Sequence, residues 1–189
     1  MTIGIIGVCS ATLNFATRAI EYGHEVLISH YRNNESMRAT VQEMGCNVKF
    51  VSKEKAAKAK IIILFVPFEE IDSFMSDLPD MTGKILIHTN NSIFSMECLQ
   101  FELRTKLSSE IIARLLPKAY SLKILTILNP NLISPVTINA NEIFYLTTNQ
   151  KIKKKVDEFL ETLNFSPYDF EEICRINASN EVVNEFELT

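Results

Sequence analysis

Glycine is scarce in this chain, with five among 189 residues. Gly23 and Gly45 fall where helices are expected to end, and Gly83 precedes a predicted strand; all three are places where a backbone needs the conformational freedom of glycine. Gly7 lies at the turn between the first predicted strand and the helix after it. In a chain so poor in glycine, that placement makes Gly7 informative.

The four cysteines form neither a disulfide framework nor a metal site. Cys9, Cys46, Cys98 and Cys174 are scattered, without a CxxC pair or a histidine at metal-ligand spacing. This pattern is typical of reduced thiols in a cytosolic protein. We therefore expect no bound metal and a cytoplasmic location.

The sequence lacks an excess of basic residues and a long apolar run. Its formal net charge is −4, which argues against a nucleic-acid partner. Residues 171–189 hold five glutamates and one arginine, and we expect this acidic tail to be helical or partly mobile, or to pack on a partner subunit in a homodimer. The run Ile61–Pro67 is too short to cross a bilayer, and Met1–Val8 lacks the basic start of a signal peptide.

Strand-like and helix-like segments alternate along residues 1–170. The apolar strand Ile61–Val66 shows no alternation of polar and apolar residues, as expected when helices cover both faces of a sheet. The pattern predicts one α/β domain, a doubly wound, Rossmann-like and mostly parallel sheet. The predicted strands are Thr2–Ile6, Glu25–Ser29, Asn47–Val51, Lys60–Val66, Lys84–His88, Leu122–Leu128, Glu142–Thr147 and Pro167–Phe170. The first predicted helix follows the turn that ends at Thr12 and runs to about Tyr22. The other predicted helices are Glu35–Met44, Lys53–Ala59, Glu69–Ser76, Ser95–Leu116 and Lys151–Leu163.

The first turn resembles a dinucleotide phosphate loop that retains one of its three glycines. Gly7 is present, whereas Cys9 and Thr12 occupy the second and third glycine positions. One interpretation is that the helix N-terminus still binds phosphate through free amides, helped by Ser10, Ala11 and the Thr12 hydroxyl. The other is that the site has drifted and Gly7 survives as a turn residue only. A reactive thiol at Cys9 is a third interpretation.

The end of the second strand indicates NADP rather than NAD. An NAD site has an acidic residue there to bind the ribose hydroxyls, but this strand ends in Ser29, His30, Tyr31 and Arg32. A guanidinium suits a 2′-phosphate, so Arg32 is the predicted phosphate ligand, and Tyr31 or His30 would flank the adenine. The alternative is a solvated surface arginine.

Several short motifs, in order, resemble the NADP oxidoreductases that depend on the deazaflavin coenzyme F-420, whose NADP-binding module also occurs in membrane ferric reductases. The matching segments are Ile3–Gly7, Gly23–Val26, Ser29–Arg32, Phe65–Pro67, Gly83–Ile85 and Leu163–Pro167. The resemblance implies that Val66 and Pro67 face the nicotinamide half of NADP(H), and that hydride passes between NADP(H) and a flavin or deazaflavin.

Two loops depart from the family pattern. After the fifth strand, His88, Thr89, Asn90 and Asn91 lack the family's proline, and after the sixth strand Asn129 alone is kept. Asn90, Asn129 and His88 are still predicted to line the cofactor crevice. His88 is the one candidate for a catalytic side chain; the alternative is a structural histidine at a strand end. The departures leave a second hypothesis open, a catalytically degenerate Rossmann-fold protein that binds another ligand or a protein partner.

Overall fold

The computed structural model describes residues 1–30, 36–89, 92–93, 107–127, 141–147, 149–173 and 175. Its strands are β1 (Thr2–Ile6), β2 (Glu25–Ser29), β3 (Val48–Phe50), β4 (Ile61–Leu64), β5 (Ile85–His88), β6 (Ser92–Ile93), β7 (Tyr120–Ile127), β8 (Glu142–Leu146) and β9 (Ser166–Asp169). Its helices are α1 (Ser10–Glu21), α2 (Ser36–Glu43), α3 (Lys53–Ala56), α4 (Ile71–Ser76), α6 (Leu107–Leu115) and α7 (Gln150–Thr162), with a 3-10 turn η1 at Phe68–Glu70.

The strands form one sheet in the order β3-β2-β1-β4-β5-β7-β8-β9, with β6 paired to β7. Every pairing is parallel except that of β7 with β8. The sheet reverses its order of winding between β1 and β4, since β2 and β3 lie on one side of β1 and the later strands on the other. The predicted α/β fold, a doubly wound and mostly parallel sheet, is confirmed.

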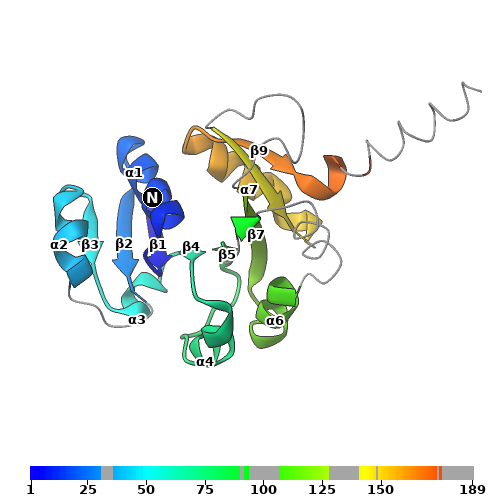
Figure 1. Ribbon diagram of the computed structural model, residues 1–189, viewed down its shortest axis with the longest axis horizontal. Helices are drawn as coiled ribbons and strands as arrows, with labels where there is room; N and C mark the ends of the chain where they lie inside the picture. The colour runs from blue at the N-terminus through cyan, green and yellow to red at the C-terminus, as the bar shows by residue number, and fades with distance from the viewer. Residues whose placement is uncertain are drawn as a thin grey trace, which may run out of the picture.

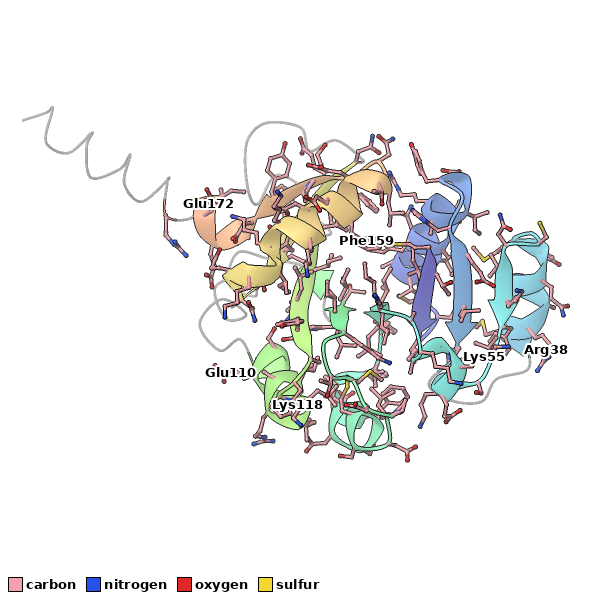
Figure 2. The ribbon with its side chains drawn as sticks, turned by 180° about the vertical axis from the view of Figure 1, so that it is seen from behind. Arg38, Lys55, Glu110, Lys118, Phe159 and Glu172 are labelled. Atoms are coloured by element: carbon pink, nitrogen blue, oxygen red, sulfur yellow. The ribbon has the colours of Figure 1, made fainter. Side chains whose placement is uncertain are left out.

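Helices cover both faces of the sheet, as the uninterrupted apolar strands predict. Figure 1 shows α1 and α7 above the row of strands and α3, α4 and α6 below it. In Figure 2, which shows the molecule from behind, Phe159 marks α7 and Glu110 marks α6 on the opposite side. Two buried clusters match these layers: α1, α2 and α7 pack on one face, and α3, α4 and α6 on the other.

Close approach of backbones explains two of the glycines. A Cβ on Gly4 would lie 2.3 Å from the Ala56 carbonyl oxygen, because α3 packs directly on β1. Gly7 has a φ of +92°, and a Cβ there would lie 1.7 Å from the Phe65 carbonyl oxygen. No larger residue fits either position without moving the backbone.

Several elements are shorter in the structure than the sequence predicts. The helix predicted over Lys53–Ala59 ends at Ala56, and the strand predicted over Lys60–Val66 covers Ile61–Leu64. Tight turns at 57–60 and the chain's exit from the sheet after Leu64 account for both differences. Of the helix predicted over Ser95–Leu116, the described part is Leu107–Leu115. Residues from 176 onward, which include most of the acidic tail, lie outside the described residues.

Candidate functional site

The carboxyl ends of β1, β2, β4 and β5 meet at one edge of the sheet, where doubly wound folds bind ligands. Gly7 directly follows β1 and contacts the backbone at the ends of both neighbouring strands. Its amide donates to the Ser29 carbonyl at 2.8 Å, and its α-carbon faces the Phe65 backbone. The Phe65 amide in turn donates to the Ile6 carbonyl at 2.8 Å. These contacts hold the three strand ends together and place the start of α1 at the point where the strand order reverses.

Thr12, at the third glycine position, is fully buried, and its side chain is hydrogen-bonded to the backbone of the turn. Its hydroxyl donates to the Gly7 carbonyl at 2.9 Å and accepts the Cys9 amide at 2.9 Å. The Cys9 carbonyl lies 3.1 Å from the same hydroxyl and Cys9 Sγ 3.7 Å. A threonine thus satisfies two backbone groups of the loop that glycine would leave to water or to a ligand. The sequence interpretation missed this capping function of Thr12, because the usual capping box has Glu or Gln at this third helical position.

The start of α1 still offers amides to an anion. Cys9 is the N-cap residue, with an extended backbone (φ −147°, ψ 174°), and Ser10 and Ala11 begin the helix. The first amides of a helix have no partner within it, and the helix dipole favours negative charge there. Ser10 is exposed, whereas Cys9 and Ala11 are half-buried. The predicted phosphate-binding residues therefore lie together, with the Cys9 amide already occupied by Thr12.

The end of β2 is described as far as His30. Ser29 is buried, and its hydroxyl lies 3.5 Å from the His30 carbonyl oxygen. His30 is half-buried at the same edge of the sheet as Gly7. Tyr31 and Arg32 lie outside the described residues, so the predicted 2′-phosphate contact remains a prediction.

The end of β4 lies beside Gly7, which precedes α1. Val66 is fully buried and Pro67 half-buried, and the chain turns there into η1, with the Glu70 amide donating to the Pro67 carbonyl at 3.0 Å. The Thr89 amide donates to the Leu64 carbonyl at 3.1 Å, which joins the ends of β4 and β5. Val66, Pro67 and Thr89 thus lie at the edge of the sheet predicted to face the nicotinamide.

His88 is fully buried at the end of β5. Its Nε2 lies 3.3 Å from the Ser109 hydroxyl on α6, and its buried Nδ1 has no hydrogen-bond partner among the described residues. The buried Lys123 is its register partner on β7. Burial, and then the charge of Lys123, lowers the pKa of His88 to about 3. The imidazole is therefore neutral at physiological pH, and its Nε2 can form a hydrogen bond with the Ser109 hydroxyl. Asn90 and Asn129 lie outside the described residues.

The described part of the chain shows no metal site, disulfide or membrane-spanning helix. No group of three histidine, cysteine, aspartate or glutamate side chains there is close enough to hold a metal ion. The two cysteines with described positions, Cys9 and Cys46, are free thiols. No described helix combines the length and the hydropathy that a membrane span requires.

Comparison with known families places the crevice in context. Residues 2–92 match the model of the family described as NADP oxidoreductase, coenzyme F420-dependent. The resemblance predicted from the sequence is confirmed. The matched stretch runs from β1 to the first residue of β6 and contains the predicted phosphate loop, the end of β2 and the ends of β4 and β5. These are the segments that carry an NADP-dependent oxidoreductase site in a Rossmann-like fold. No curated protein matches the chain.

Solved structures share the fold. A hypothetical protein from Sinorhizobium meliloti is 25% identical, with a TM-score of 0.69 over 89% of this chain and 84% of that one. A protein from Arthrobacter sp. FB24, provisionally named an F420-dependent NADP reductase, is 17% identical, with a TM-score of 0.61 over 90% and 84%. An imine reductase from Aspergillus terreus, solved with NADPH4, is 13% identical, with a TM-score of 0.58 over 98% of this chain and 64% of its own.

Proposed function

We propose that this chain is an NADP(H)-binding oxidoreductase module that passes hydride between NADP(H) and a flavin or deazaflavin acceptor. The observation that carries the proposal is the family match over residues 2–92, a stretch that includes Gly7, α1 and the carboxyl ends of β2, β4 and β5 at one edge of the sheet. NADPH, when bound, supplies a hydride and needs little acid–base help from the protein. We further propose that the protein acts in the cytoplasm, as a monomer or a homodimer.

In this proposal, different residues would hold different parts of the cofactor. The amides of Ser10 and Ala11 would hold the pyrophosphate at the helix start, and Arg32 would bind the 2′-phosphate as a charged, two-pronged donor. His30 and Tyr31 would lie beside the adenine, and Ser29 beneath it in the β2 edge. Val66 and Pro67 would exclude water beside the nicotinamide, with Asn90 and Asn129 as amide contacts and His88 behind them.

A second candidate is a degenerate module that binds a different ligand or a protein. It is favoured by the Thr12 hydroxyl, which occupies the Cys9 amide, and by the Cys9 side chain, which occupies a position where the fingerprint has glycine. Both reduce the open backbone surface that a pyrophosphate uses. The two candidates differ in whether nucleotides bind the crevice.

Thermal unfolding with NADPH, NADP and NADH tests the choice. Ligand at one hundred times its dissociation constant adds about 2.7 kcal/mol to the free energy of unfolding, so we expect a clear rise in Tm with NADPH and a smaller one with NADH. Absence of any shift at millimolar nucleotide would reject the first candidate. NADPH oxidation with a flavin or a deazaflavin as acceptor then measures turnover.

Arg32→Ala tests the source of the NADP preference. We expect it to weaken NADPH binding at least tenfold and to leave NADH binding unchanged, because NADH has no 2′-phosphate. Arg38→Ala is the matched control, since Arg38 lies on α2 with its guanidinium 5.5 Å from the centre of the Phe50 ring. An unchanged preference in Arg32→Ala would remove Arg32 from this function.

A further inference from the structure

A cavity lies at the amino ends of the strands, at the opposite edge of the sheet from the proposed cofactor site. It has a volume of about 790 Å³ and is lined by residues at the amino ends of β1, β4 and β5 together with one residue of α7. Four of its lining residues are lysines: Lys58, Lys60, Lys84 and Lys155. Its volume lies within the range of small-molecule sites, roughly 300–1,000 Å³. The crevice proposed for NADP(H) is formed by the carboxyl ends of the same strands, so the two sites are separated by the length of the sheet.

The four lysines come from separate parts of the chain. Lys58 and Lys60 flank the turn between α3 and β4, Lys84 precedes β5, and Lys155 belongs to α7 on the other face of the sheet. None of the described residues that line the cavity is acidic. Asp80 accepts hydrogen bonds from the amide and hydroxyl of Thr82, and the charge of Lys84 adds a weaker electrostatic interaction with its carboxylate. The fold thus gathers cations in a protein whose net charge is −4.

Within the described residues, none of these four lysines forms a salt bridge, whereas several nearby lysines do. On α7, Lys153 pairs with Asp169 and Glu172, and Lys154 pairs with Glu158. Lys53, which begins α3, pairs with Asp77. The four cavity lysines thus have no carboxylate partner within salt-bridge distance among the described residues, as is also true of Lys55, Lys118 and Lys151 away from the cavity.

Lys84 is the best-placed of the four. It is half-buried, and its ammonium donates to the carbonyl of Ala57 at the end of α3. This bond holds one positive charge at the cavity and still leaves two ammonium protons for a ligand. Apolar side chains of Ala59, Ile61 and Ile85 line part of the remainder, so the cavity offers cationic donors beside an apolar surface.

We propose that this cavity binds a small organic anion with two or more phosphate or carboxylate charges. Positive charges collected in a hollow with low-dielectric walls produce a focused potential that concentrates anions, and lysine is a point-charge ligand for such groups. The ammonium groups bind the charged part of the ligand, and the Ile61 and Ile85 side chains contact its apolar part. The proposal does not depend on nucleotide binding at the crevice.

Calorimetric titration of the full chain with pyrophosphate tests this site, at constant ionic strength and with chloride as the monovalent reference. The test variant is Lys60→Gln with Lys155→Gln, since both side chains are exposed. The matched control is Lys55→Gln with Lys151→Gln, which removes the same charge from exposed residues of α3 and α7 that do not line the cavity. We expect pyrophosphate binding to weaken at least tenfold in the test variant and to stay within twofold in the control.

Three results would overturn the proposal: no pyrophosphate binding by the unaltered chain, equal weakening in both variants, or displacement of pyrophosphate by NADPH in the unaltered chain and not in Arg32→Ala. The last would assign the anion to the crevice. Citrate in place of pyrophosphate distinguishes the ligand class, because tighter binding of citrate indicates a carboxylate ligand and tighter binding of pyrophosphate a phosphorylated one. A failure of NADPH to bind leaves the cavity test unaffected.

Discussion

At the residue scale, Asn164 shows how a glycine position can be filled by another residue. It follows α7 with a φ of +59°, and its amide donates to the Glu161 carbonyl at 2.9 Å. This is the left-handed conformation that commonly ends helices, usually with glycine and sometimes with asparagine. Asn164 stands in the segment Leu163–Pro167, where the family pattern has glycine at this place. Asn164 thus adopts a conformation for which glycine is the usual residue.

Substitution of Asn164 tests that reading. Asn164→Gly should stay within about 0.5 kcal/mol of the unaltered chain, whereas Asn164→Val should lose roughly 1–2 kcal/mol because a β-branched residue is strained at positive φ. Urea unfolding measures both. Glu161→Val, at an exposed helical position, controls for the low helix propensity of valine. If Asn164→Val were as stable as Asn164→Gly, the left-handed conformation would not be what this position requires.

At the element scale, Thr12 decides how well α1 begins. Thr12→Val keeps the shape of the side chain and removes the hydroxyl that joins Gly7 to Cys9, so a buried carbonyl and a half-buried amide lose their partner. We expect a loss of about 1–3 kcal/mol in the free energy of unfolding, and Thr12→Ser should recover most of it. Thr17→Val, at an exposed position of the same helix, is the control. Equal stabilities of Thr12→Val and Thr12→Ser would contradict this capping function.

The elements also show what sequence patterns can and cannot predict. The apolar run at Ile61–Val66 predicts a buried strand, because periodicity and burial are local properties. The direction of β8 relative to β7 is not local, and nothing in Glu142–Leu146 predicts that it is antiparallel. The hydrogen bonds of Thr12 to Gly7 and Cys9 were missed because the fingerprint specifies only where glycine is expected. It does not say what a hydroxyl at one of those positions can bind. Likewise, Lys58 and Lys155 lie far apart in the sequence and meet through the fold.

At the scale of the whole molecule, one sheet separates two edges with different chemistry. Its carboxyl edge carries the turn of Gly7 and the start of α1, and its amino edge carries the four lysines that line the cavity. Between them, near the carboxyl edge, lie the buried His88 and Lys123 on adjacent strands. Burying His88 beside the buried Lys123 costs little free energy only while the imidazole is neutral. Both desolvation and the neighbouring positive charge oppose its protonation. That requirement couples the stability of the whole fold to pH.

The unfolded chain protonates His88 near its ordinary pKa of about 6.5, whereas the folded chain holds its pKa near 3. The unfolded state thus binds more protons between these values, and stability must fall as the pH is lowered. We expect a loss of about 2 kcal/mol from His88 alone between pH 7 and pH 5, measured by urea unfolding at each pH. Exposed carboxylates such as Glu25 and Glu172 have pKa values lowered by their lysine partners, so their contribution is lost at more acidic pH. His88→Asn should flatten the profile above pH 5, whereas His24→Asn, at a half-buried histidine, should leave most of the slope. A slope unchanged in His88→Asn would show that this imidazole is not the group that couples folding to pH.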